Sequence, residues 1–436
     1  IEGDTNQSLC VLTNIMNAHK FAKAHGYTHI FYNTFDVNLH QADVEMVNRF
    51  FDMMGDEWQL KPTSTGHVSL SDLPVLAKTS GFKGVTGDIG FDEKGDILYF
   101  HANEQSPVNQ DVYSVNLTTF EMKRITDGNG YHNAILSKNG DFIIDNFTSC
   151  YIPREYRIIS TSTKKSFLFY TSENPIKDYK LGKWNLFSIK NEKGTDLFCR
   201  MFKPVDFDST KKYPVLVYLY NGPHSQMVTN TWMAGGELWY QYMAQKGFIV
   251  FTLDGRGTSF RGSEFEQSIF RQLGTVEMED QLKGVEFLKS LPYVDAARLG
   301  VHGWSFGGFM TTSLMTRNPG VFKVGVCGGP VIDWSYYEIM YGERYMDTPQ
   351  ENKEGYDKNN LLNYVDKLKG KLLMIHGAQD DVVVAQVQRR AFLAEAEVDH
   401  QQAHALARSL HAHVTVHEPR GGGHALEVRV RPVAVA

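Results

Sequence analysis

A serine between glycines lies at the point where a predicted strand passes into a predicted helix. Residues 303–308 read G-W-S-F-G-G, a G-x-S-x-G pattern with one additional glycine. Residues 298–303 have the apolar composition of a short strand, and residues 306–315 have helical spacing. A strand-to-helix turn this tight leaves no space for side chains beside Ser305, so glycines are expected and the hydroxyl projects above the sheet. We interpret the segment as a nucleophile elbow; the alternative is a purely structural turn.

Strands and helices alternate along the chain from Trp184 to about Val384. Such an alternation predicts a parallel sheet with helices on both faces, so the serine turn belongs to an α/β domain. The expected strands are 215–220, 248–253, 299–303, 323–327 and 372–376, and the expected helices are 236–245, 277–290 and 306–317.

The segment 84–180 has a different pattern, in which short strands follow one another with a turn signal about every ten residues. This pattern is typical of antiparallel blades. The expected strands include 96–100 after the Lys94-Gly95 turn, 112–115, and 142–145 after the Asn139-Gly140 turn.

Residues 1–80 have the texture of a further α/β segment. Helical patterns at 18–24 and 42–54 lie on either side of an aromatic strand at 28–35, which ends at Asp36. This stretch is faintly similar to a fragment of a nucleotide-sugar glycosyltransferase, and the segment is otherwise unassigned.

The size and composition of the chain are those of a globular protein with two or three domains. A formal net charge of −6 gives no sign of nucleic acid or a membrane surface as a partner. No apolar run reaches the ~18 residues that a membrane-spanning helix needs. The sequence starts at Ile1 without a basic-then-apolar leader, so we expect that an export signal was removed or was never present.

The four cysteines are scattered and form no C-x-x-C pair. Their spacing implies no metal site, and a disulfide framework is unusual in a chain of this size. We expect buried free thiols at Cys10, Cys150, Cys199 and Cys327.

A serine nucleophile needs a base, which is usually a histidine held by a carboxylate. In the order found in α/β hydrolases, the acid and then the histidine follow the serine, each after a later strand. The predicted strand 372–376 leads into a loop that carries Asp380 and Asp381. We predict Asp380 as the acid, because it follows the penultimate strand and has Val383 three residues on. The alternative is a solvated acidic turn.

The base lies in a tail of unusual composition. From Ala385 onward there are eleven alanines and six histidines, but no lysine, isoleucine, tyrosine, tryptophan or asparagine. His424 is the best placed, because 413–417 is strand-like and 419–423 is a loop that would deliver it. For each tail histidine the alternative is a plain surface residue. The candidates are His400, His404, His411, His413, His417 and His424.

An acyl-transfer enzyme must also stabilise an oxyanion with preset donors. The backbone N–H of Phe306, directly after the serine, is one candidate donor. The second candidate is the hydroxyl of Tyr220, which leads into the loop 221–224 after a predicted strand. The alternative is a tyrosine packed under that loop.

By these residues the chain resembles the dipeptidyl-peptidase IV branch of the prolyl oligopeptidase family of serine peptidases. Within that branch, Cys327–Met346 and Thr348–Tyr356 are most similar to bacterial prolyl tripeptidyl peptidases. The resemblance covers 84–384 and is most specific from 184 onward. The motifs that carry it are Tyr220-Asn221-Gly222-Pro223, Asp254-Gly255-Arg256-Gly257 through Arg261-Gly262, Gly303–Gly308, and His376-Gly377 with Asp380-Asp381.

The resemblance implies an α/β-hydrolase domain preceded by a β-propeller. It implies an enzyme that releases short peptides ending in proline from the free N-terminus of oligopeptides, without a metal or organic cofactor. Ser305 would be the nucleophile, Asp380 the acid and Tyr220 an oxyanion donor. Glu338 matches an acidic residue that receives the α-ammonium group of the substrate.

The resemblance also implies an apolar pocket for the proline ring, which flat aromatic walls would hold well. The same aromatic residues at helical spacing would, without the resemblance, be interpreted as core. The implied pocket residues are Phe306, Val331, Trp334, Tyr337, Tyr341 and Val383.

The chain departs from the family pattern in two regions. Family propellers have about eight blades, whereas 84–180 is long enough for about two. The resemblance stops at Val384, and the family's base would fall near Ala412, between His411 and His413. We therefore predict a truncated propeller portion. We hypothesise that the chain is a fusion of fragments that meet near Ala385, or the product of a mis-assembled reading frame.

The main functional hypothesis is a serine exopeptidase that releases di- or tripeptides after proline through an acyl-enzyme at Ser305. One alternative is another α/β hydrolase, such as an esterase or acylaminoacyl peptidase. The other is a catalytically inactive fusion or fragment. The expected partners are oligopeptides with proline near the N-terminus, and a homodimer is an option. Family resemblance favours a periplasmic or cell-surface location in a bacterium.

Overall fold

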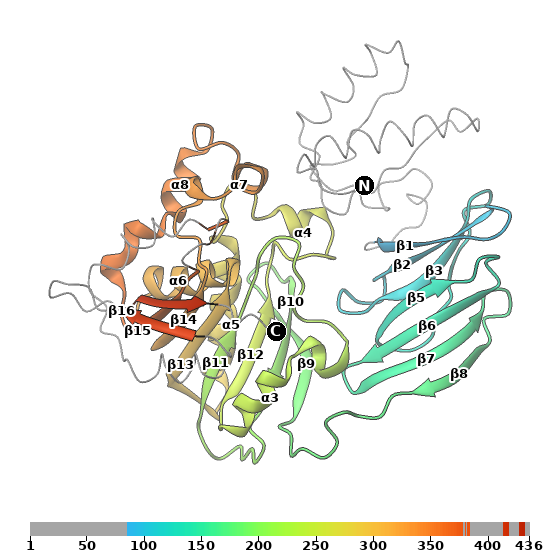
Figure 1. The fold of residues 1–436 in the computed structure, drawn as a ribbon, viewed down its shortest axis with the longest axis horizontal. Coiled ribbons are helices and arrows are strands. Elements are labelled where there is room, and N and C mark those ends of the chain that lie inside the picture. Colours follow the sequence, from blue (N-terminus) through green and yellow to red (C-terminus); the bar gives the residue numbers. More distant parts are fainter. Residues whose placement is uncertain (1–84, 378–379, 381, 384–412, 418–426, 432–436) are drawn as a thin grey trace, which may run out of the picture.

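The computed structural model describes residues 85–377, 380, 382–383, 413–417 and 427–431. The predicted α/β segment at 1–80 lies outside the described residues, and so does His424. Figure 1 shows two small sheets beside a larger α/β unit.

The first eight strands form two four-stranded antiparallel sheets, each built from strands in sequence order. The predicted strands at 96–100, 112–115 and 142–145 are confirmed. Gly95 and Gly140 have φ values of 73° and 77°, which explains glycine at these two turns. The first sheet holds β1 (Val85–Phe91), β2 (Ile97–Ala102), β3 (Asp111–Asn116) and β4 (Met122–Arg124); the second holds β5 (Tyr131–Leu136), β6 (Phe142–Ser149), β7 (Ile152–Ser160) and β8 (Ser166–Thr171).

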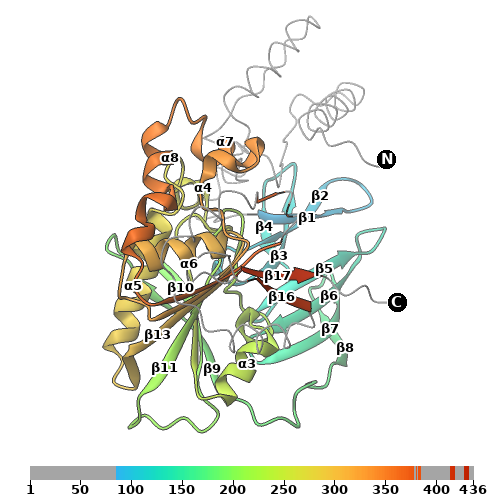
Figure 2. The same cartoon turned by 60° about the vertical axis from the view of Figure 1, so that its left-hand side comes forward.

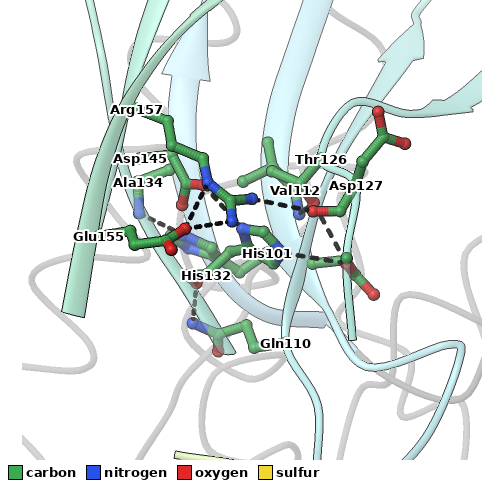
Figure 3. A network of polar contacts seen from close by, with 12 residues as sticks. His101, Gln110, Val112, Thr126, Asp127, His132, Ala134, Asp145, Glu155 and Arg157 are labelled. Carbon is green, nitrogen blue, oxygen red and sulfur yellow. Dashed lines mark hydrogen bonds and ion pairs between the residues drawn. The ribbon is translucent and has the colours of Figure 1, made fainter. Parts of the chain in front are cut away.

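The two sheets pack through apolar side chains, including Val112 of the first and Ile143 of the second. A buried polar network crosses the same interface (Figure 3). Nδ1 of His132 on β5 lies 2.8 Å from a carboxylate oxygen of Asp145 on β6, and its Nε2 lies 3.7 Å from Asp111 on β3. The imidazole therefore joins carboxylates from both sheets at a site that excludes water.

The α/β unit has a seven-stranded sheet in the order β15-β14-β13-β11-β12-β10-β9. The five predicted strands are confirmed, and β12, β11, β13, β14 and β15 pair in parallel. Two antiparallel strands, β9 and β10, extend one edge and were not predicted. The strands are β9 (Trp184–Lys190), β10 (Asp196–Phe202), β11 (Tyr213–Tyr218), β12 (Ile249–Asp254), β13 (Val294–Trp304), β14 (Val324–Gly328) and β15 (Lys371–Ile375).

Helices cover both faces of this sheet, as the alternation predicted. On β12, Ile249 and Phe251 belong to the core under α5 and α6, whereas Val250 packs with Tyr240 of α3. The three predicted helices are confirmed as α3 (Leu238–Gln245), α5 (Val276–Ser290) and α6 (Phe306–Arg317). The other helices are η2 (Trp232–Gly235), α4 (Ser263–Gln267), η3 (Trp334–Tyr336), α7 (Ile339–Met346), α8 (Lys353–Asn359) and η4 (Leu361–Lys367).

Both views place α4, α7 and α8 together at the upper end of the α/β unit (Figures 1 and 2). In the described part of the tail, β16 (His413–His417) pairs with β17 (Glu427–Arg431) in an antiparallel hairpin. This confirms the strand expected at 413–417. None of the helices that the structure describes has the length and apolarity to cross a membrane.

Three of the four cysteines lie in the described residues. Cys150, Cys199 and Cys327 are buried free thiols, as expected, and Cys10 lies outside the described residues.

Candidate active site

Ser305 occupies the turn between β13 and α6 in a strained backbone conformation. Its φ of 57° and ψ of −118° are unusual for a residue with a side chain. The conformation is fixed on both sides of the turn. The N–H of Ser305 donates to the carbonyl of Gly328 at 2.8 Å, and its carbonyl accepts from the N–H of Phe309 at 3.0 Å.

The glycines around Ser305 are explained by backbone crowding. A Cβ at Gly303 would overlap the carbonyl oxygen of Gly307, and one at Gly307 would overlap that of Leu219. A Cβ at Gly308 would overlap the carbonyl oxygen of Gly328. Helix α6 therefore begins in direct backbone contact with the ends of β11 and β14, which is the arrangement expected of a nucleophile elbow.

The loop after β11 brings Tyr220 to the same place. The rings of Tyr220 and Phe306 have centroids 6.2 Å apart. Phe306 is the first residue of α6, and its N–H has no acceptor within the helix because of its position. Both predicted oxyanion donors thus belong to residues that contact each other beside Ser305.

Helices η3 and α7 place an aromatic cluster against Phe306. The rings of Phe306 and Trp334 lie 5.6 Å apart, and Trp334 stacks on Tyr341 at 5.9 Å with an interplanar angle of 10°. Tyr337 packs edge-on against both, at 5.4 and 5.2 Å. Val331 and Val383 are buried in the same core. The structure therefore brings together the predicted pocket residues.

The phenols of this cluster stay neutral. Burial raises the pKa of Tyr341 well above its ordinary value. Burial also raises the pKa of Tyr337, followed by the negative charge of Glu338 and then by Tyr220 and Asp380. The pocket wall is thus uncharged over the ordinary pH range, which suits an apolar ring.

Asp380 lies in a loop that follows β15, and backbone amides hold its carboxylate. Its Oδ1 accepts from the N–H of Val382 at 3.1 Å and of Val383 at 2.8 Å. Its Oδ2 lies 3.8 Å from Nε2 of His376, a nitrogen that is also 2.9 Å from the carbonyl of Val383. No role was predicted for His376, although its place directly after a strand and before Gly377 could have identified it.

The predicted base is not among the described residues. His424 lies outside them, and for His413 and His417 the structure describes only the β16 backbone. Glu338 is described, and it is an exposed residue at the N-cap of α7, next to Tyr337. Its carboxylate is accessible to a charged group that approaches the aromatic cluster.

Two buried carboxyl groups near the site were not predicted from the sequence. Asp254, at the end of β12, accepts from the N–H groups of Met227 and Val228 at 2.9 and 2.7 Å, and burial raises its pKa to about 6. Glu277 on α5 accepts from the N–H of Gly274 at 2.9 Å, and burial raises its pKa to about 8. Asp254 thus fixes the backbone at 227–228, and Glu277 fixes the backbone at Gly274.

Two family models match the chain. The model of the prolyl oligopeptidase family matches residues 237–420, and the model of the dipeptidyl peptidase IV (DPP IV) N-terminal region matches residues 8–154. The first match extends beyond Val384, where the resemblance was expected to stop. The second begins within the segment 1–80, where the sequence pattern predicts an α/β segment and no blade.

The curated proteins and solved structures that match the chain carry names from the same group of peptidases. The "Probable dipeptidyl-aminopeptidase B" of Sclerotinia sclerotiorum is 35% identical over 71% of this chain and 34% of its own length. Human dipeptidyl peptidase 8 is 31% identical over 75% of this chain and 39% of its length. A Bacteroides ovatus structure titled "putative dipeptidyl aminopeptidase IV" is 48% identical with a TM-score of 0.68, covering 70% of this chain and 44% of that one.

Porphyromonas gingivalis dipeptidyl peptidase 4 is 33% identical with a TM-score of 0.66, covering 72% of this chain and 44% of that one. The chain thus spans about a third of the length of the first curated relatives it matches.

Proposed function

The chain belongs to the prolyl oligopeptidase family of serine peptidases, and from that premise we propose that it cleaves short peptides from the N-terminus of oligopeptides after proline. The observation that carries the proposal is the contact between the strained turn at Ser305 and the aromatic cluster that begins at Phe306. For cleavage after proline, the nucleophile must lie next to an apolar pocket that can hold the proline ring.

The proposed reaction is acyl transfer. The Ser305 hydroxyl oxygen attacks the carbonyl carbon of the proline residue while its proton passes to a histidine. The C–N bond then breaks, the leaving amine takes that proton, and the acyl group stays on Ser305 as an ester. Water hydrolyses the ester by the same proton route. Asp380 would orient the histidine, and its hydrogen bonds from the N–H groups of Val382 and Val383 fix the carboxyl group for that role.

We propose Tyr220 and the Phe306 amide as the donors to the oxyanion. Such donors stabilise the tetrahedral intermediate because they are oriented before the charge develops. The contact between the two residues supports this assignment.

The substrate's proline ring would occupy the pocket formed by the aromatic cluster with Val331 and Val383. Glu338 would accept the α-ammonium group, because it is exposed at the edge of that cluster. The curated relatives are named dipeptidyl-aminopeptidase or dipeptidyl peptidase, which favours dipeptides as the released product. Cys327–Met346 is similar to tripeptidyl peptidases, so release of tripeptides is the alternative that the test below distinguishes.

We interpret the two antiparallel sheets, β1–β4 and β5–β8, as two blades of a propeller portion within 84–180, followed by the peptidase domain from 184 to 436. Their meander order and face-to-face packing support this interpretation. The boundary at 80–84 and the origin of the tail from Ala385 stay predictions. His424 stays the proposed base.

The test compares Gly-Pro and Ala-Ala-Pro anilides with a short-chain ester, using the full chain and the variants Ser305→Ala, His424→Ala and His411→Ala. Serine-dependent turnover of one prolyl anilide, lost in His424→Ala but kept in His411→Ala, is the expected result. Preference for the ester would favour a general α/β hydrolase. A folded protein without any turnover would favour the inactive fragment.

A further inference from the structure

A buried glutamine of helix α5 reaches the loop that carries Tyr220. Gln281 is 1% exposed, and its Nε2 donates to Oδ1 of Asn221 at 2.6 Å and to the carbonyl of Leu253 at 2.9 Å. Leu253 lies near the end of β12, and Asn221 follows β11. Gln281 therefore ties together the carboxyl ends of two neighbouring parallel strands, where sites in α/β sheets are built.

Asn221 adopts a backbone conformation that needs such support. Its φ is 61°, in the left-handed region, and it is 1% exposed. Asparagine tolerates this region better than most residues, but the conformation persists only where its surroundings fix it. Within the described part of the chain, Nδ2 of Asn221 has no hydrogen-bond partner, so the bond from Gln281 is the polar contact that fixes the side chain.

Asn221 connects Tyr220 to the backbone that packs over the tyrosine ring. After Asn221 the chain folds back over the tyrosine, since a Cβ at Gly222 would come within 2.5 Å of Cε1 of the Tyr220 ring and 3.2 Å of the Phe306 Cβ. If Asn221 adopted a right-handed or extended backbone conformation instead, the loop after it would run in a different direction. Tyr220 would then no longer be held against Phe306.

We propose that Gln281 is a positioning residue for the oxyanion site: its bond to Asn221 keeps the left-handed turn that holds Tyr220 beside Ser305. The inference rests on the proposed function, in which Tyr220 donates to the oxyanion. Gln281 acts through Asn221 and Tyr220 and contacts no reacting atom.

The first test is kinetic and uses Gln281→Leu in the full chain. The matched control is Gln241→Leu. Gln241 is 3% exposed and makes two hydrogen bonds to the backbone of Gly182, but it lies on α3, away from Tyr220. We expect Gln281→Leu to lower kcat about tenfold or more with KM nearly unchanged, because the oxyanion donor is displaced. Gln241→Leu should leave both parameters near those of the parent protein.

A double-mutant cycle separates positioning from general destabilisation. In the Tyr220→Phe background, Gln281→Leu should lower kcat by no more than about twofold, because the group that it positions is already absent. In the Asn221→Gly background the loss should shrink in the same way, because glycine adopts the left-handed turn without support. Full losses in both backgrounds would overturn the proposal.

A second readout does not depend on activity. In protein labelled with 3-fluorotyrosine, the ¹⁹F resonance of Tyr220 is identified by its loss in Tyr220→Phe. Gln281→Leu should move this resonance, and Gln241→Leu should not. An unmoved resonance in folded Gln281→Leu overturns the positioning role, even in a chain that proves active. A moved resonance in a chain without peptidase activity would support the role of Gln281 and contradict the proposed function instead.

Discussion

The phenol ring of Tyr220 lies beside the ring of Phe306, with centroids 6.2 Å apart. Phe306 directly follows Ser305, so the loop after β11 and the turn after β13 meet at the proposed reaction centre. The contact crosses 86 residues of sequence and depends on the parallel pairing of β11 with β13.

Replacement of Tyr220 by phenylalanine removes the proposed donor and keeps the ring. We expect kcat for a prolyl anilide to fall by roughly 10²- to 10³-fold with little change in KM, because the bond forms mainly in the transition state. Tyr218→Phe is the control. Tyr218 packs against Trp239 and Tyr240 of α3 instead. Equal effects of the two substitutions on kcat would show that Tyr220 is not a donor to the oxyanion.

Glu338→Gln tests recognition of the substrate's amino terminus. Loss of a charge-assisted bond should raise KM for a free Gly-Pro anilide roughly tenfold or more. KM for an N-acetylated substrate should not change. The preference of the enzyme for the free-amine substrate over the acetylated one should therefore become smaller. Glu343→Gln on the same helix is the control, since Glu343 is also exposed. An unchanged ratio of the two substrates would show that Glu338 does not bind the ammonium group.

Glu277 should make the protein less stable as pH rises. Burial raises its pKa in the folded state to about 8, against 4.5 for an ordinary glutamate. Between these values the folded protein keeps a proton that the unfolded chain has lost, so increasing pH favours unfolding. Its contribution to stability is complete below pH 4.5 and is lost as pH rises through about 8.

Glu277→Gln should remove this dependence while keeping an acceptor for the N–H of Gly274. Measured by thermal melting, the fall in Tm between pH 5 and pH 8.5 should be smaller in the variant by roughly 5 °C or more. Parallel Tm curves for the two proteins would mean that Glu277 is ionised throughout.

The outer face of the second small sheet should cause self-association. A cross-strand row of exposed apolar residues runs over all four strands, with Ile135, Ile144, Ile158 and Phe167 exposed by 69, 47, 37 and 65%. Among the described residues β8 is the edge strand of this sheet, and an exposed apolar patch beside an edge strand favours association. Ile144→Thr with Phe167→Lys should reduce concentration-dependent light scattering and leave Tm nearly unchanged. Undiminished light scattering would mean that the protein associates through another surface.

Local patterns predicted much of the α/β unit. The serine turn could be recognised because backbone crowding at Gly303, Gly307 and Gly308 admits no other residue. Five of the seven strands followed from apolar runs with helices between them. The antiparallel strands β9 and β10 were not predicted, because no helix separates them from each other or from β11, so they lack the alternation used to find the others.

Contacts between distant residues could not be predicted. Gln281 and Asn221 are 60 residues apart, and no sequence motif links the two positions. The same holds for His132, whose two carboxylate partners come from different sheets. The burial that raises the pKa of Asp254 and Glu277 is likewise a property of the packed fold. The base stays a prediction, because His424 lies outside the described residues.

The most direct test of the account is covalent labelling of the nucleophile. The full chain would be treated with a fluorophosphonate, digested and analysed by mass spectrometry, with Ser305→Ala as the control. We expect one phosphonylated peptide that contains Ser305, and no labelling in the variant. A folded protein that remains unlabelled, or is labelled at another residue, would contradict the assignment of Ser305 as the nucleophile.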